Sequence, residues 1–163
     1  MATSVTLNPE QAAFLEGPLS MNVGAVSPDG WPCVCRALGV AVARDRRSLA
    51  ILLSSDLSRT VLDAIDAGSA VTLVASRPAT HATLQFKAET ARRMALKPVH
   101  RALNARYARA LGSELAALGF GAALVDGLVT MLTATDLVAL RFAPQIVFEQ
   151  TPGPEAGRVL LPP

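Results

Sequence analysis

The sequence predicts an α+β fold in which a small antiparallel β-barrel carries flanking helices. Strand-like segments separated by turn signals fill the first half of the chain, a long helical segment follows, and strand-like segments return near the end. Strands followed by helices are typical of α+β proteins, whereas regular alternation would indicate a doubly wound parallel sheet. The length of 163 residues suits a single domain, 1–163, with a core that needs no metal or disulfide.

The first half begins with a short helix. Asn8 is typical of an N-cap, Pro9 of the first helical position, and Gln11 of the residue that completes a capping box. The pair Gly17-Pro18 ends this helix. Three strands are expected next as an antiparallel meander, over Met21–Val26, Pro32–Ala43 and Leu49–Ser55.

The rest of the chain contains further strands and a helical insertion at about 98–133. A helix is expected over about Ser58–Ala67, followed by strands over Ala70–Ser76 and Thr83–Thr90. The insertion holds a long helix that starts at Pro98 and a second one over about Gly121–Leu132, and the last strands are Leu137–Phe142 and Ile146–Phe148. Apolar residues at helical spacing predict the buried stripe of the long helix: Val99, Leu103, Tyr107, Leu111, Leu115 and Leu118.

Composition limits the classes of partner. Hydrophobic residues make up 51% of the chain and charged ones 17%, which is too apolar for disorder and leaves surface for a second subunit to cover. Residues 87–110 hold seven Lys and Arg against Glu89, as either a solvated helix face or a surface for an anionic group. A net charge of +2 does not by itself indicate nucleic acid, so no nucleic-acid partner is expected, and a nucleic-acid contact through the basic segment 87–110 is the third alternative. The two cysteines, the lack of a secretory signal and the lack of a membrane span predict a cytoplasmic location.

Arg36 is a lone charge on the strand expected over Pro32–Ala43. One face of this strand carries small residues, suited to a flat ring, a dimer partner or simple tight packing. The other face carries Arg36 among large apolar side chains, and a buried charge without a partner costs about 3–5 kcal/mol. We therefore expect Arg36 to meet either a carboxylate of this chain or an anion of a ligand.

A cluster of hydroxyls lies where a strand ends and a helix begins. Free N–H groups make a helix start a natural anion site, and a cation in the first turn, as at Arg59, opposes the helix dipole unless an anion binds there. The alternative is a capping cluster with an exposed arginine. The candidate residues are Ser54, Ser55, Ser58, Arg59 and Thr60.

The remaining candidates are weaker. His81 precedes the strand that contains Gln85, and is either a surface histidine or part of a polar site. Cys33 and Cys35 are interpreted as core cysteines, because a zinc site needs four ligands and the others are missing. No metal site is expected, and no catalytic residue is identified.

The order of these elements resembles the core of the pyridoxamine 5′-phosphate oxidase-like split barrels. No single motif is decisive, and the resemblance covers roughly residues 14–90 and, more weakly, 136–158. It is carried by Arg36-Ala37-Leu38, Leu49–Ser55, Ser58-Arg59-Thr60, Ala70–Ser76 and His81–Ala88.

The resemblance implies an antiparallel split β-barrel with flanking helices that holds FMN at a homodimer interface. It implies a flavin-dependent oxidoreductase that acts on a small-molecule substrate. Arg36, Ser54, Ser55, Ser58 and Arg59 would then bind the phosphate, and Thr83 and Gln85 would approach the ring; Thr60 and His81 complete the candidate set.

Two departures from the family matter. Thr60 stands where the family often has Lys, so Arg59, Arg77 or His81 would have to supply the missing phosphate cation. The C-terminal Trp and Arg signature of the true oxidases has no match in 158–163, so oxidation of pyridoxamine phosphate is not expected. The alternatives are a deazaflavin in place of FMN, or a dimeric binding module without catalysis that has lost flavin and takes haem, with His81 as its ligand, or a small anion.

Overall fold

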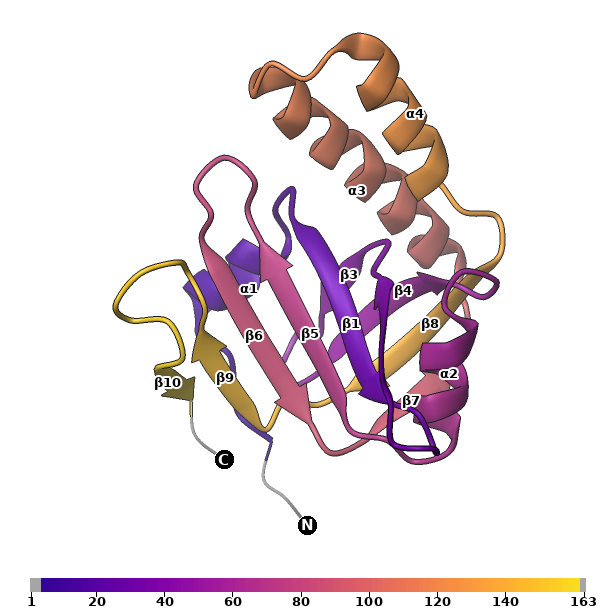
Figure 1. The fold of residues 1–163 in the computed structure, drawn as a ribbon, viewed down its shortest axis with the longest axis vertical. Coiled ribbons are helices and arrows are strands. Elements are labelled where there is room, and N and C mark those ends of the chain that lie inside the picture. Colours follow the sequence, from indigo (N-terminus) through magenta and orange to yellow (C-terminus); the bar gives the residue numbers. More distant parts are fainter. Residues whose placement is uncertain (1–3, 162–163) are drawn as a thin grey trace.

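Two antiparallel β-sheets form the body of the molecule in the computed structural model, which describes residues 4–161 (Figure 1). The larger sheet has the strand order β10-β9-β6-β5-β1-β2 and the smaller one β3-β4-β8-β7. The strands are β1 (Ser20–Val26), β2 (Pro32–Arg36), β3 (Val40–Val42), β4 (Leu49–Ser54), β5 (Val71–Ser76), β6 (Thr83–Ala88), β7 (Ala91–Met94), β8 (Leu137–Phe142), β9 (Ile146–Glu149) and β10 (Val159–Leu161). Together with the helices described below, these sheets confirm the α+β class.

The prediction of one continuous strand over Pro32–Ala43 was wrong. β2 pairs with β1 in the larger sheet, and β3 pairs with β4 in the smaller sheet, so the expected meander is two hairpins in different sheets. The chain crosses between the sheets at 37–39, where Gly39 has a φ of 146°. A Cβ there would lie 3.4 Å from Leu52 Cδ1 and 3.5 Å from Leu103 Cγ. The crossing therefore favours glycine by both its conformation and its close packing.

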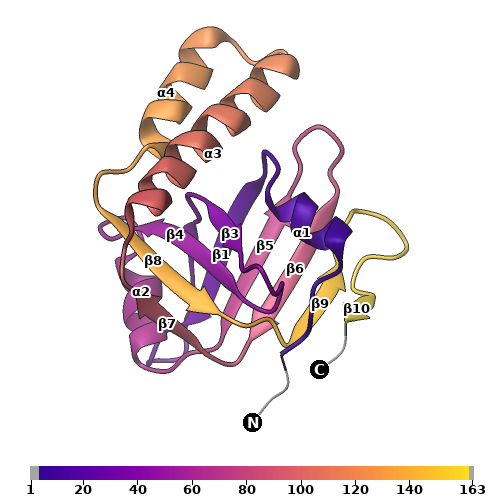
Figure 2. The ribbon, with the colours of Figure 1, turned by 180° about the vertical axis from the view of Figure 1, so that it is seen from behind.

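The helices of the described chain lie close to their expected positions. They are α1 (Pro9–Leu15), α2 (Arg59–Asp66), α3 (Pro98–Ala117) and α4 (Ala122–Leu132). The capping box of α1 is confirmed, since Gln11 N donates to Asn8 Oδ1 at 2.8 Å and Asn8 N donates to Gln11 Oε1 at 3.0 Å. α3 and α4 form a hairpin that projects from one end of the sheets (Figures 1 and 2), which confirms the helical insertion.

The buried face of α3 differs from the expected apolar stripe. Val99 and Leu118 are exposed, whereas His100 and Asn104 are buried. Asn104 Nδ2 donates to the carbonyl oxygens of Leu38 and Leu132, each at 2.8 Å. Polar residues are buried here because hydrogen bonds attach α3 to the crossing segment and to the end of α4.

Two edge strands were not expected from the sequence. β7 pairs with β8 and carries the exposed residues Arg92 and Arg93. These two charged residues interrupt the apolar pattern from which a strand is predicted, although charged residues are common on edge strands. β10 pairs with β9 and lies after Ile146–Phe148, the last strand that was expected. Both strands are short, so the sequence carries little periodic signal for them.

One face of the larger sheet packs on the core, and the other is uncovered by any element of residues 4–161 (Figure 1). Leu73 and Phe86 are fully buried on the inner face. On the outer face Val34 is 70% exposed. Within the described residues, no helix is both long enough and apolar enough to cross a membrane.

Candidate functional site

Arg36 ends β2 on the uncovered face, and the salt bridge considered for it is not formed. No carboxylate within residues 4–161 pairs with it, and its Nη2 donates a long hydrogen bond to Ser20 Oγ at 3.4 Å. Its Nε is buried and has no hydrogen-bond partner in that part of the chain. A buried guanidinium nitrogen without a partner is costly, so this atom is suited to receive an acceptor from a ligand.

Tyr107 of α3 lies beside Arg36. Its hydroxyl donates to the carbonyl oxygen of Leu19 at 2.8 Å. Burial raises the pKa of Tyr107 to about 12, although the Arg36 guanidinium acts in the opposite direction. Tyr107 is therefore a neutral neighbour and does not balance the charge of Arg36. The sequence suggested only a packing role for Tyr107.

The hydroxyls of Ser54 and Ser55 bind a carboxylate of this chain. Ser54 Oγ and Ser55 Oγ donate to Asp136 Oδ2 at 2.6 and 3.1 Å, and the backbone nitrogen of Asp56 donates to the same oxygen at 3.0 Å. The Ser54 hydroxyl and the Asp56 N–H, with a smaller effect of Ser55, lower the pKa of Asp136 from 3.8 to about 2. An ionised side chain of the protein thus binds the donors that were expected to take a phosphate.

Asp136 was not among the candidates from the sequence. It immediately precedes β8, and the pairing of Ser54 with Leu137 brings it to the end of β4. Only knowledge of the β4–β8 pairing would have identified it, because the two segments are far apart in the chain.

The start of α2 holds the next three candidates. Ser58 is buried, and its Oγ has no hydrogen-bond partner within residues 4–161. The Ser58 side chain lies against Cys35. Burial raises the pKa of the Cys35 thiol, and Ser58 partly offsets this rise. Arg59 is exposed and lies 3.7 Å from Asp56. Thr60 is exposed, and its carbonyl oxygen accepts a weak hydrogen bond from Cys33 Sγ at 3.8 Å. Because side chains alternate along a strand, Cys35 faces α2 while Arg36 points to the opposite face.

The three candidates around β6 lie apart from those near β2. Thr83 Oγ1 lies 2.8 Å from Ser76 Oγ and from the carbonyl oxygen of His81. Gln85 Oε1 accepts a hydrogen bond from Gln150 Nε2 at 3.2 Å. His81 is exposed in a turn, with a φ of 60°. Within residues 4–161, no hydrogen bond or ion pair joins these side chains directly to Arg36 or to the start of α2.

The register nevertheless places Gln85 and Arg36 in one transverse row of the larger sheet. Gln85 pairs with Val74, Val74 with Asn22, and Asn22 with Arg36. Three strand spacings separate the two ends of this row, or about 14 Å between backbones. Within residues 4–161, no three His, Cys, Asp or Glu side chains come together in a way that would hold a metal ion.

No protein-family model and no curated protein matches the sequence significantly, but solved structures do match the fold. A candidate pyridoxamine 5′-phosphate oxidase from Lactobacillus delbrueckii aligns with a TM-score of 0.54 at 18% identity, over 88% of this chain and 93% of that one. The chain has the fold of the pyridoxamine 5′-phosphate oxidase-like proteins. The chain also aligns with HupZ of Group A Streptococcus, with a TM-score of 0.56 at 12% identity over 93% of this chain and 100% of that one.

Proposed function

We propose that this protein is an FMN-binding flavoprotein, a flavin-dependent oxidoreductase whose two sheets form a split β-barrel. The observation that carries the proposal is Arg36, whose buried Nε has no partner in the described chain. The oxidase-like fold supports it, although at this level of identity the likeness concerns the fold alone. A phosphate dianion would give the guanidinium a charge-assisted acceptor.

FMN, when bound, would supply the electron transfer, and the protein would bind and orient it. Arg36 would hold the phosphate. Arg59 and Thr60 are exposed at the start of α2, on the side of β2 opposite to Arg36, and would assist only after that helix start moves toward the phosphate. Ser54 and Ser55 would contribute only after exchanging Asp136 for the phosphate, because their hydroxyls already bind that carboxylate. The proposed phosphate contacts are therefore fewer than the sequence suggested.

We propose further that the working form is a homodimer. In one chain, Arg36 and Gln85 lie at opposite ends of a transverse row on the uncovered face of the larger sheet. Val34, on the same face as this row, is 70% exposed, and Trp31, in the turn between β1 and β2, is 71% exposed, which leaves apolar surface for a second subunit to cover. A second copy of the chain on this face would cover these apolar side chains, and would bring its Gln85 near Arg36 of the first copy.

A second candidate function is a dimeric binding module without catalysis. The observation that favours it is Asp136, whose ionised carboxylate binds the hydroxyls that a flavin phosphate would use and would repel a nearby dianion. In that case Arg36 would bind a smaller anion. Haem is the other ligand of this alternative, with the exposed His81 as its candidate axial residue.

The deciding experiment is an absorbance spectrum of freshly purified protein, followed by titration with FMN and with haem. Flavin bands or saturable quenching of FMN fluorescence would support the flavoprotein. Absence of both would overturn it. A Soret band that disappears in His81→Ala would then support the haem module, and a deazaflavin titrated in parallel tests the related cofactor.

A further inference from the structure

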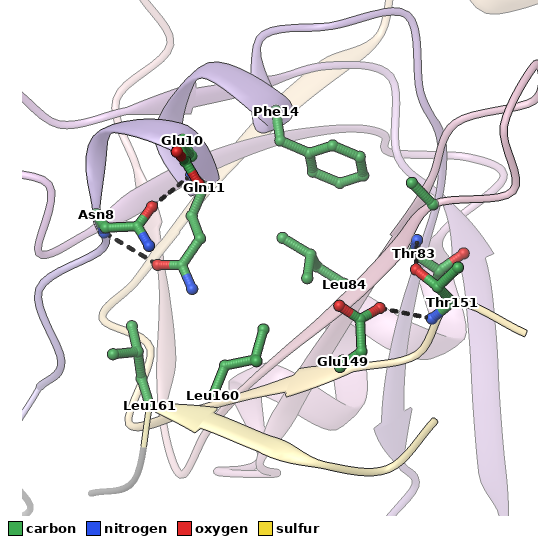
Figure 3. A pocket seen from close by; sticks show the side chains of 11 residues that line it. Asn8, Glu10, Gln11, Phe14, Thr83, Leu84, Glu149, Thr151, Leu160 and Leu161 are labelled. Carbon is green, nitrogen blue, oxygen red and sulfur yellow. Dashed lines mark hydrogen bonds between the residues drawn. The ribbon is translucent and has the colours of Figure 1, made fainter. Parts of the chain in front are cut away.

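A cavity of about 420 Å³ lies between α1, the start of β6, β9 and β10 (Figure 3). Thr83, one of the flavin candidates, is among its lining residues. Leu84 also lines the cavity, and side-chain alternation along β6 turns Leu84 away from the face that carries Gln85. Its volume is within the range of about 300–1,000 Å³ that is usual for small-molecule sites.

Apolar side chains form the body of the cavity. Phe14 and Leu84 point toward one another across it, and Leu160 and Leu161 of β10 close the lower side (Figure 3). These walls would take an apolar group of a ligand, since burying apolar surface is favourable by about 25 cal/mol per Å².

Gln11 supplies a hydrogen-bond donor without a partner. The residue is only 7% exposed, and its Oε1 accepts the hydrogen bond from Asn8 that completes the capping box. This bond turns the amide nitrogen of Gln11 into the cavity (Figure 3), where it makes no hydrogen bond to any other residue of 4–161. This nitrogen is not enclosed, because it is not one of the buried atoms without a partner in the described chain, so a ligand oxygen would accept from it in place of water.

Glu149 places a negative charge opposite Gln11. Thr151 N donates to its Oε1 at 2.8 Å, and hydrogen bonds from Thr151 keep the pKa of Glu149 below its ordinary value. Arg158 also acts on this carboxylate, but it is paired with Glu155 at 2.6 Å. Glu10, at the rim, adds a second carboxylate. The polar part of the cavity therefore attracts a cation.

We propose that this cavity binds a small organic ammonium ion that carries an apolar group and a neutral acceptor oxygen. The ammonium pairs with Glu149, the oxygen accepts from the Gln11 amide, and the apolar group lies between Phe14 and Leu84. An anionic or purely apolar molecule would leave Glu149 or Gln11 without a partner.

Phenylalaninamide is a suitable probe, because it combines a phenyl group, an ammonium and an amide oxygen. Its binding to the full chain is measured by titration calorimetry and by NMR shifts at about pH 6, where its amine is charged. The matched comparison is 3-phenylpropanamide, which lacks only the amine. We expect the probe to bind at least about tenfold more tightly than this analogue.

The variant Glu149→Gln removes the negative charge and keeps an oxygen that accepts from Thr151 N. It should lower the affinity for phenylalaninamide by at least about tenfold. Asp126→Asn, which changes an exposed acid of α4 that does not line the cavity, is the control and should leave binding unchanged. Leu160→Trp, which fills the space without touching a charge, should abolish binding. The proposal is overturned by absence of saturable binding, by equal binding of 3-phenylpropanamide, or by an unchanged affinity in Glu149→Gln.

Discussion

Arg36 and Gln85 occupy opposite ends of one transverse row on the uncovered face of the larger sheet, with Asn22 and Val74 between them. The two residues come from distant parts of the chain and share a face because β2, β1, β5 and β6 are consecutive in the sheet. One chain presents two separated polar groups on a surface that is otherwise partly apolar. This arrangement has direct consequences for assembly.

The first prediction concerns the dimer. Val34→Asp, which places a charge on the uncovered face, should convert the proposed homodimer to a monomer, because an unpaired charge would be buried in the interface. Sedimentation velocity measures the change. Val99→Asp on α3, where the valine is 64% exposed, is the matched control and should stay dimeric. A wild-type protein that sediments as a monomer would contradict the prediction.

The second prediction concerns Asp136. Its pKa is about 2 in the folded chain and 3.8 in the reference state, so the folded state binds the proton less tightly. Its contribution to stability is therefore complete above pH 3.8 and is lost as the pH falls toward 2. Asp136→Asn should lower the free energy of unfolding by about 2 kcal/mol at neutral pH. The difference in free energy of unfolding between wild type and variant should become smaller as the pH falls toward 2.

Urea denaturation over this pH range measures the effect of Asp136→Asn. Asp126→Asn, an exposed position on α4, is the control and should behave as wild type. Equal stability of wild type and Asp136→Asn at neutral pH would show that the hydrogen bonds from Ser54 and Ser55 to the Asp136 carboxylate do not stabilise the folded protein.

Local signals allowed much of the fold to be predicted, and long-range pairings caused most of the errors. The capping box of α1 and the alternation of β6 lie within a few neighbouring residues, and both were found correctly. The break at Gly39 depends on Leu52 and Leu103, which pack against it from other elements. A run of β-forming residues cannot reveal that it divides between two sheets.

The same distinction applies to the candidate site. Residue type and position identified Arg36 as a charge in need of a partner, and its buried Nε is consistent with that reading. The sequence could not show that Asp136 would bind Ser54 and Ser55, because the contact depends on how β8 pairs with β4. Nor could it show that the β6 candidates lie apart from those at β2.

The third prediction concerns the packing of the helical hairpin. A Cβ at Gly112 of α3 would lie 2.5 Å from Val129 Cγ2 and 3.3 Å from Val125 Cγ1. Gly112→Ala should destabilise the protein by about 1–3 kcal/mol, because the stiff valines cannot move aside freely. Gly127→Ala in α4 meets nothing within 4 Å and should instead stabilise by up to about 1 kcal/mol. Thermal unfolding of both variants measures these opposite signs, and a stabilised Gly112→Ala would disprove the close packing.

The last prediction concerns the role of Arg36. Arg36→Ala should weaken FMN binding by about tenfold to a hundredfold, since a hydrogen bond to a charged group contributes about 1.5–3 kcal/mol, and the double variant with Arg59→Ala should retain no flavin. Without ligand, Arg36→Ala should be as stable as wild type or more so, because a buried nitrogen without a partner is removed. Arg92→Ala on β7 removes an exposed charge far from this face and serves as the control in both measurements. Fluorescence titration and urea denaturation separate the two roles: a variant that loses stability but keeps its FMN affinity would make Arg36 a structural residue.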